Sequence, residues 1–368
     1  MTGEYWGNGV ALMLTIGQEG SPLTEINADS DIRAVTFTPN GKYIVGGGED
    51  GIGVWRVEDG KQMATMAARD VQCLAVSQDS GRWIAAGTFD AYVFVWDATT
   101  LEQCFAYKDD QSILAVDFSP DSTRLLVGQN HHTGLSVWDV PTRKKVLTLE
   151  HPFTTVAKYS PQGDRIATAT DDSVRVWDSD DGHLLVHIPM EVTPFFNTGL
   201  LWLNNHLFVV SGSTIKQLEA SSRSIVSEWP VPSSDSHSCI ALPRHREFIV
   251  YSTNDTVTFW DTSTHAQLGL IQHPQAISVA LSPDDRFLAI GGKSGGIIIR
   301  SVSRIRVSIV SLWIMANLNN FLVPLVFPNR IQSHYLVYIQ PSRSLTFKST
   351  TLRSIHGNAI SSRTRTRY

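Results

Sequence analysis

Short apolar runs recur along residues 21–302 in a fixed order, each separated from the next by a polar turn. In one unit the run AVTF is followed by the turn TPNGK, the strand-like run YIVGGG, the run IGVW and the run QMATMA. Such runs are short, rich in Val, Ile, Thr and aromatic residues, and bounded by turn-forming residues, which is typical of β-strands. No segment keeps a period of 3.6 residues, so the pattern predicts four short strands per unit and no helix.

Tryptophan marks the third run of most units. The Trp-Asp pairs are Trp96-Asp97, Trp138-Asp139, Trp177-Asp178 and Trp260-Asp261, and Trp55-Arg56 precedes them. Successive tryptophans are 41, 42 and 39 residues apart, and then 83. The last step equals two units, so one unit has lost its tryptophan near Leu218, and a further unit places its third strand around Ile299. The chain therefore carries seven units.

Four short strands per unit with Trp-Asp at the end of the third strand resemble the WD-repeat β-propeller family. The resemblance covers about residues 21–302 and implies an all-β fold, a seven-bladed propeller with an irregular C-terminal tail. It also implies that residues 22–28 supply the outer strand of the last blade, beside Ile297–Ile299, and so close the ring.

The family often has a buried hydrogen-bonded set of His, Ser or Thr, Trp and a turn Asp in each blade. Only the fourth unit offers such a set, with His151, Asp171 and Trp177. Its hydroxyl partner, Thr168 or Thr170, is out of phase by one residue. We therefore expect apolar packing between blades, more than repeated polar networks, to hold the ring together.

Composition divides the chain into three parts. Hydrophobic residues make up 42% and charged residues 18%, which is typical of a globular protein. Residues 1–302 hold all 35 acidic and 21 basic side chains, a charge of −14, whereas residues 303–368 hold nine basic side chains and no acidic one. We predict an N-terminal extension over 1–20, the propeller over 21–302, and a poorly ordered basic tail over 303–368.

The tail leaves three interpretations open. It can contain a short buried or aggregation-prone segment over 308–327. Residues 308–327 approach the length of a membrane span and are flanked by arginines, so they could tether the protein to a membrane. Val307-Ser308 can also be encoded by a splice-donor-like sequence, which would make the tail a translated intron.

In the family, the loops that enter the first strands and the loops between second and third strands share one face. Here these loops are rich in acidic residues, whereas the opposite turns carry Lys42, Arg82, Arg124, Arg165, Arg246 and Arg286. An acidic face can recruit a basic peptide or tail, although turn aspartates can also simply cap turns. The candidate partner-binding residues are Asp31, Asp70, Asp110, Phe153, Phe195 and His237.

The sequence contains no motif typical of a catalytic site or of a cofactor-binding site. The three cysteines are widely spaced, which favours a reducing, intracellular location in the cytoplasm or nucleus and excludes a paired-cysteine zinc site. His131-His132 lacks two further ligands, and the glycine runs at 46–48 and 291–292 lack the Lys and helix of a phosphate loop. The repeat residues Trp55, Trp96, Trp138, Trp177 and Trp260 are expected in the core, and the charge of −14 opposes nucleic-acid binding.

The sequence therefore predicts a non-catalytic scaffold for protein–protein interaction, with no metal and no cofactor. Its partner is expected to be a protein of an intracellular assembly, bound by the acidic loop face. Two alternatives stay open: a membrane-tethered adaptor that uses residues 308–327, and a propeller enzyme with a site at the central axis.

Overall fold

The computed structural model describes residues 23–28, 30–78, 81–129, 134–190, 199–221, 224–232, 239–243, 248–253, 255–293 and 295–302, together with two strands near the C-terminus. The described residues form strands and turns and contain no α-helix. The chain divides into two compact units, residues 15–307 and residues 1–14 with 308–368. In the second unit the described part is an antiparallel pair, β29 (Tyr335–Tyr338) and β30 (Thr346–Ser349).

The first unit contains seven antiparallel sheets of four strands each, which we number as blades one to seven. Blade one holds β2 (Ile32–Phe37), β3 (Tyr43–Gly48), β4 (Ile52–Arg56) and β5 (Gln62–Met66). Blade two holds β6 (Val71–Val76), β7 (Trp83–Thr88), β8 (Tyr92–Asp97) and β9 (Gln103–Lys108). Blade three holds β10 (Ile113–Phe118), β11 (Arg124–Gln129), β12 (Leu135–Asp139) and β13 (Lys144–Leu149).

The remaining blades continue the same order along the chain. Blade four holds β14 (Val156–Tyr159), β15 (Arg165–Ala169), β16 (Ser173–Asp178) and β17 (Leu184–Pro189). Blade five holds β18 (Leu200–Leu203), β19 (His206–Ser211), β20 (Thr214–Glu219) and β21 (Ser224–Pro230). Blade six holds β22 (Cys239–Ala241), β23 (Phe248–Ser252), β24 (Thr256–Asp261) and β25 (Gln267–Gln272). Blade seven holds β26 (Ala276–Leu281), β27 (Phe287–Gly292), β28 (Gly296–Ser301) and β1 (Thr24–Asn27).

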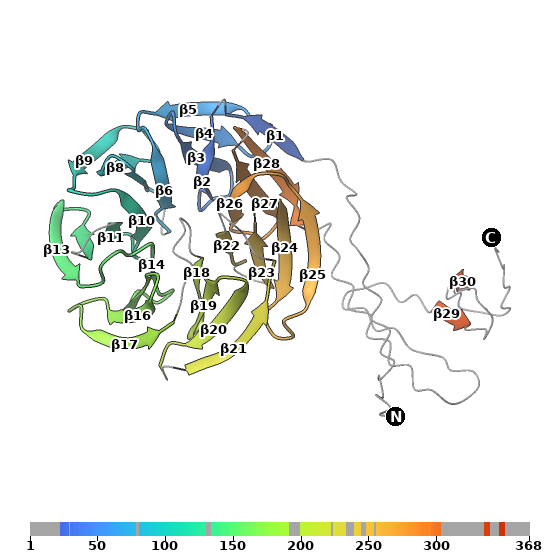
Figure 1. Cartoon of the computed structure of the whole chain (residues 1–368). Helices are drawn as coiled ribbons and strands as arrows, with labels where there is room; N and C mark the ends of the chain where they lie inside the picture. The colour runs from blue at the N-terminus through green and yellow to red at the C-terminus, as the bar shows by residue number, and fades with distance from the viewer. Residues whose placement is uncertain are drawn as a thin grey trace, which may run out of the picture. The chain divides into compact units, whose positions relative to one another are not determined.

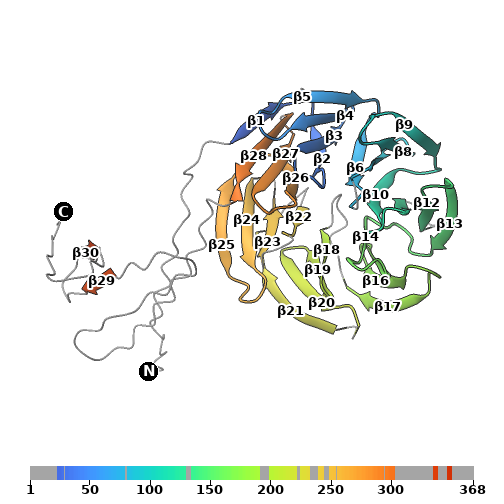
Figure 2. The ribbon, with the colours of Figure 1, turned by 180° about the vertical axis from the view of Figure 1, so that it is seen from behind.

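The blades stand in a ring, with the first strand of each at the centre and the fourth at the rim (Figure 1). The view from behind shows the same ring, in which β1 lies beside β28 (Figure 2). The outer strand of blade seven thus comes from the N-terminal part of the chain, with Thr24 opposite Ile299 and Ile26 opposite Ile297. The seven-bladed all-β fold predicted from the repeat is confirmed.

The core consists of seven separate apolar clusters, and each joins two neighbouring blades. One cluster joins blades seven and one through Ile297, Ile299, Phe37 and Trp55. The others lie between the six further pairs of adjacent blades. Because each strand buries side chains toward the next sheet, the ring is stabilised by burial of apolar surface all the way round.

The strand register defines one repeat position in every blade. The second residue of each second strand pairs with this position, as Ile44 does with Trp55 and Ile166 with Trp177. In blade five the position is Leu218, which pairs with Leu207, as the spacing predicted. In blade seven it is Arg300, opposite Leu288. The expectation of Ile299 was wrong by one residue, because the step from Trp260 is 40 residues and not 39.

Candidate partner-binding face

Backbone hydrogen bonds bring the acidic loops to one face of the propeller. The loops that enter first strands form backbone hydrogen bonds with the loops between second and third strands of the same blade or of the preceding blade. Asp70 N donates to Glu49 O (3.0 Å), Met190 N to Asp172 O (2.9 Å) and Lys293 N to Gln275 O (3.1 Å). We call this side of the ring the acidic face.

Carboxylates on this face concentrate in the loops of blades one to three. They belong to Asp31, Glu49, Asp50, Asp70, Asp90, Asp109 and Asp110. Two of them accept a hydrogen bond from a neighbouring side chain: Thr88 Oγ1 donates to Asp90 Oδ1 (2.6 Å), and Gln129 Nε2 donates to Asp109. Asp110 is exposed, and its backbone N–H donates to Asp109 Oδ1 (2.8 Å).

Asp70 carries the ion pair of this face. Within the described part of the face, the one ion pair joins Arg33 Nη1 to Asp70 Oδ1 at 3.3 Å. The two side chains are 30% and 47% exposed, so the pair contributes little to stability and leaves the carboxylate accessible. The φ angle of Asp70 is 50°, a left-handed conformation that aspartate tolerates better than most residues.

Asp31 is placed by a close backbone approach at the end of β3. A Cβ on Gly48 would lie 1.6 Å from the carbonyl oxygen of Asp31, so only glycine fits there. The side chain of Asp31 is half-buried, in contrast to those of Glu49 and Asp50 in the next loop of the same blade, which are exposed.

Two exposed phenylalanines stand in the same set of loops. Phe153 is 43% exposed and has a φ angle of 57°, which is unusual for a bulky residue. Phe89 is 57% exposed, and its backbone bonds to both neighbouring loops: its N–H donates to Asp70 O (2.9 Å), and its carbonyl accepts from Ser112 Oγ (2.6 Å). Sequence reasoning missed Phe89, although an aromatic residue directly before a turn Asp was a usable signal. Phe195 and His237, the other two predicted contact residues, lie outside the described residues.

A buried polar network supports the loop that carries Phe153. Trp177 Nε1 donates to Thr168 Oγ1 (2.9 Å), and Thr168 Oγ1 lies 2.6 Å from His151 Nδ1. His151 Nε2 lies 3.2 Å from Ser173 Oγ, which donates to Asp172 Oδ1 (2.7 Å). These distances fit a neutral imidazole whose Nε2–H donates to Ser173.

The network decides one open choice in the predicted set and corrects one residue of it. Its hydroxyl is Thr168, and its carboxylate is Asp172 and not Asp171, because Ser173 stands between the histidine and the carboxylate. Burial first, and then the charge of Arg175, lower the pKa of His151 to about 3. His273, the other histidine near the expected place, instead bonds Pro274 O through Nδ1 (3.0 Å).

The repeat tryptophans lie on third strands. Trp55, Trp96, Trp177 and Trp260 are buried, and Trp260 Nε1 donates to Thr258 Oγ1 (2.8 Å). Trp138 is half-buried and stacks on Tyr107 with ring centroids 4.1 Å apart. Their positions inside the sheets leave them no role as an exposed stacking platform.

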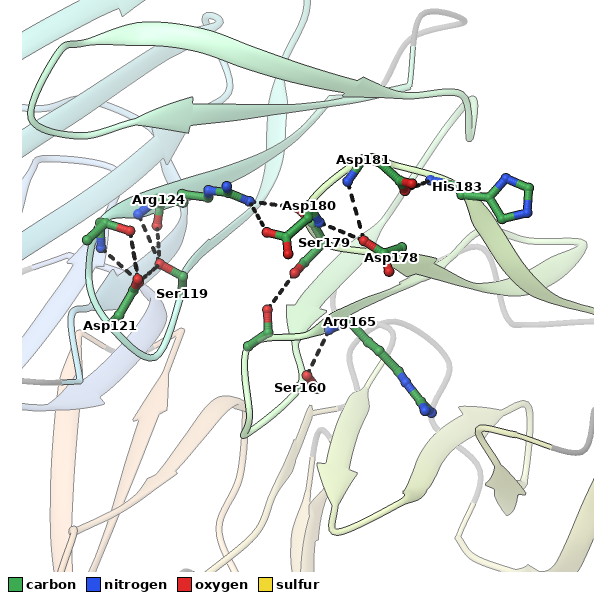
Figure 3. A network of polar contacts seen from close by, with 12 residues as sticks. Ser119, Asp121, Arg124, Ser160, Arg165, Asp178, Ser179, Asp180, Asp181 and His183 are labelled. Carbon is green, nitrogen blue, oxygen red and sulfur yellow. Dashed lines mark hydrogen bonds and ion pairs between the residues drawn. The ribbon is translucent and has the colours of Figure 1, made fainter.

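Several arginines of the opposite face form ion pairs within that face. Figure 3 shows how Arg124 reaches from its turn to the next blade, where Nη1 donates to Ser179 O (2.7 Å) and pairs with Asp180 Oδ1 (3.2 Å). The other described ion pairs of this face are Arg56–Asp59, Arg82–Asp97, Arg165–Asp164 and Arg286–Asp284. Aspartates here also hold turns, as Asp178 does by accepting from the N–H groups of Asp180 and Asp181. The predicted basic residues of this face are therefore mostly neutralised, and Arg246 lies outside the described residues.

One described ion pair joins two innermost strands to each other. Lys158 Nζ bonds Asp117 Oδ1 (3.0 Å), and Asp117 Oδ2 accepts from Tyr159 N (2.9 Å). Burial disfavours the charged lysine, but the charge and hydrogen bond of Asp117 outweigh it and raise the pKa of Lys158. Both carboxylate oxygens are thus engaged in joining β10 to β14, which is a structural arrangement.

Among the described residues, no three His, Cys, Asp or Glu side chains come together in a way that could hold a metal ion. The same part of the chain has no helix long and apolar enough to cross a membrane. The segment 308–327 and the pair His131-His132 lie outside the described residues.

Comparisons with known proteins agree with this architecture. A family model described as "WD domain, G-beta repeat" matches residues 20–53, and one described as "Eukaryotic translation initiation factor eIF2A" matches residues 77–186. The repeats and the seven four-stranded blades are those of a seven-bladed WD-repeat β-propeller, in agreement with the match to the WD-domain model over residues 20–53.

Curated relatives include several WD-repeat and regulatory proteins. WD repeat-containing protein 18 of Danio rerio is 24% identical over 309 residues, covering 73% of this chain and 69% of the relative. Transcriptional corepressor LEUNIG_HOMOLOG of Arabidopsis thaliana is 21% identical, covering 71% of this chain but 34% of the relative. Protein groucho of Drosophila melanogaster is 28% identical, covering 45% of this chain and 24% of the relative. The chain thus spans about a third or less of the last two proteins.

Proposed function

We propose that this protein is a non-catalytic scaffold of an intracellular assembly, in the cytoplasm or the nucleus, and that it binds a protein partner through the acidic face. One observation carries the proposal. Among the described residues, the loops of blades one to three present seven carboxylates on this face, and one of them, Asp70, is ion-paired there. Uncompensated charge of one sign on one face steers and orients a partner of the other sign.

The chemistry of the face favours a basic peptide segment with apolar residues. Asp31, Asp70 and Asp110 supply negative charge, and Phe153 supplies exposed aromatic surface of the kind that anchors interfaces. Phe89 extends this set, because it lies in the loop that bonds to Asp70 O. Phe195 and His237 remain predicted contacts. Relatives named as a corepressor and as a pre-mRNA-splicing factor favour a role within a protein assembly.

The polar groups that could suggest catalysis have structural partners. His151 is enclosed by hydroxyl groups, and the Lys158–Asp117 pair joins two inner strands. We therefore propose no cofactor and no enzymatic reaction for this chain. Its rigid ring of seven interlocked sheets is suited to presenting loops.

The test is charge reversal at two positions of the acidic face. We expect the double variant Asp70→Lys, Asp110→Lys to lose binding of a labelled Lys- and Arg-rich peptide, as measured by fluorescence anisotropy. Binding to the unaltered chain should weaken with added salt, because exposed charges are screened over about 8 Å at physiological ionic strength.

The matched control is Glu58→Lys, Glu102→Lys, which makes the same change of net charge at exposed turns of the opposite face. It should keep binding, and both double variants should still unfold in a single cooperative transition. Equal loss of binding in the two double variants, or binding that ignores salt, would show that the acidic face is not the site.

A further inference from the structure

The outer strand of blade seven differs from the other six in how it is connected. In blades one to six a short turn joins the third strand to the fourth, as residues 57–61 join β4 to β5. In blade seven, β28 ends at Ser301, and its outer neighbour β1 is joined instead to β2 of blade one through residues 28–31. β1 can therefore leave blade seven without breaking any turn of that blade.

The contacts of β1 are few. It has four residues, whereas the other outer strands have five to seven. Ile26, at 4% exposure, is its one fully buried side chain and packs against Ile297 and Ile299. Glu25 and Asn27 are exposed. The outer strands β5, β13 and β21 also bury one side chain each, so β1 differs from them in its length and in having no turn to β28. A short strand without that turn should open locally at a lower free energy than the core does.

The groove that β1 occupies nevertheless makes specific contacts with the side chain of Thr24. Thr24 is half-buried, and its Oγ1 donates to Val57 O (3.3 Å) in the turn of blade one. A Cβ on Gly60 of that turn would lie 2.7 Å from Thr24 Cγ2, so the turn and β28 enclose a small residue at this position. The backbone bonds extend past the strand on both sides, from Leu23 N to Ile299 O (2.8 Å) and from Ala28 N to Gly295 O (2.6 Å). The groove thus selects an extended segment with a small hydroxyl residue two positions before a buried apolar residue.

We propose that the edge of β28 is a strand-acceptor site that β1 occupies reversibly. An extended segment of a partner polypeptide with the pattern Thr or Ser, any residue, Ile or Val adds there in place of β1. Backbone bonds to β28 supply affinity, and the pockets for Thr24 and Ile26 supply specificity, as in other cases of strand addition. This site is separate from the acidic face.

Tethering decides how the exchange can be observed. β1 belongs to the same chain, so its local concentration at β28 is in the millimolar range and a free peptide competes poorly. A substitution that weakens the docking of β1 should therefore let a free peptide bind to the edge of β28. Ile26→Asp does this in the full-length chain, because it places a charge in an apolar cluster.

The experiment measures anisotropy of a labelled peptide with the sequence of residues 21–30. We expect it to bind the Ile26→Asp chain about ten-fold or more tighter than the unaltered chain. A peptide that itself carries Ile26→Asp should bind neither. The matched control is Ile225→Asp, the same change at an exposed position of the outer strand β21, and it should bind no better than the unaltered chain. Equal binding to the Ile26→Asp and Ile225→Asp chains overturns the proposal.

A second measurement needs no substitution and guards against unfolding of the variant. In the unaltered full chain, hydrogen exchange of residues 23–28 should be faster than that of residues 144–149, the outer strand of blade three. Equal protection of the two segments would show that β1 does not leave β28, and would overturn the proposal by itself.

Discussion

At the scale of single residues, the hydroxyl of Thr168 links Trp177 to His151 in the buried hydrogen-bond network of blade four. It accepts from Trp177 Nε1 and lies within hydrogen-bond distance of His151 Nδ1, and the residue has 0% exposure. Removal of one buried partner leaves the others desolvated and unpaired, which costs more than the bond itself contributes.

Thr168→Val removes this hydroxyl at nearly constant volume. We expect a loss of about 1–3 kcal/mol in the free energy of unfolding, because His151 and Trp177 each lose a partner. Urea unfolding followed by tryptophan fluorescence measures it. Thr100→Val, at an exposed turn, is the control and should change the value by less than about 0.5 kcal/mol. If Thr168→Val left the free energy of unfolding unchanged, the network would not contribute to stability.

The same network predicts how stability depends on pH. The pKa of His151 is about 3 in the folded protein, below its ordinary value of 6.5, so the unfolded chain binds a proton that the folded chain does not bind between these values. Stability should therefore fall as the pH drops below about 6.5, by up to about 1.4 kcal/mol per pH unit from this group. The partners that face the ring are Thr168, Ser173, Asp172 and Arg175.

The measurement is urea unfolding of the unaltered chain and of His151→Gln at pH 7 and pH 5.5. His151→Gln should show the smaller loss between the two pH values, since it has no imidazole to protonate in the unfolded state. Identical losses in both proteins would contradict the assignment of the lowered pKa to this residue.

The sequence predicted single residues correctly where the repeat spacing fixes their position. It was wrong by one residue where the length of a turn fixes the position. The 41- and 42-residue steps located Leu218 as the missing repeat position. They did not separate Asp171 from Asp172 or Ile299 from Arg300, because one residue of turn length shifts which side chain faces inward. The exposure of Phe89 depends on its loop being bonded to Asp70 and Ser112, contacts that no repeat spacing encodes.

At the scale of elements, the ion pair between β10 and β14 joins blades three and four at the centre of the ring. Lys158 and Asp117 have side chains 36% and 20% exposed, so solvent screens them in part. Asp117 also accepts from the backbone of Tyr159, which makes it the member with two structural partners.

The pair predicts unequal effects of its two single substitutions. Asp117→Ala should reduce the free energy of unfolding by about 1–3 kcal/mol, because it leaves a partly buried cation and a backbone N–H without a partner. Lys158→Met should cost less, since Asp117 keeps its bond to Tyr159 N and the methionine retains most of the apolar stem. A double-mutant cycle measured by urea unfolding gives the coupling between them. A larger loss for Lys158→Met would contradict this view of Asp117.

Elements were well predicted because turn residues and apolar alternation repeat in every unit. The expected outer strand at 22–28 corresponds to β1 over Thr24–Asn27. What the pattern could not show is the β-bulge that precedes the repeat position in blades one to six, where the register of third and outer strands shifts. A bulge adds one residue without changing the apolar pattern of the third strand, so it leaves no sequence signal there.

At the scale of the whole molecule, the ring is complete within the first compact unit. All seven sheets and all seven inter-blade clusters are formed by residues up to Val302, and the last backbone bond joins Val302 N to Arg286 O at 2.8 Å. The first 302 residues also hold every acidic side chain of the chain. The residues that form the seven blades therefore also supply all the acidic side chains of the chain.

The last prediction concerns a chain that ends after Val302. It should keep the melting temperature of the full chain to within about 2 °C at 0.15 M salt, because no blade loses a strand and no cluster loses a member. Its formal charge changes from −5 to −14, so it should bind the Lys- and Arg-rich peptide at least as tightly as the full chain does. A chain that ends after Leu281 is the control: it lacks β27 and β28, opens the cluster between blades six and seven, and should not fold. Scanning calorimetry and anisotropy test both statements, and unfolding of the chain that ends after Val302 would show that the propeller needs residues beyond its seventh blade.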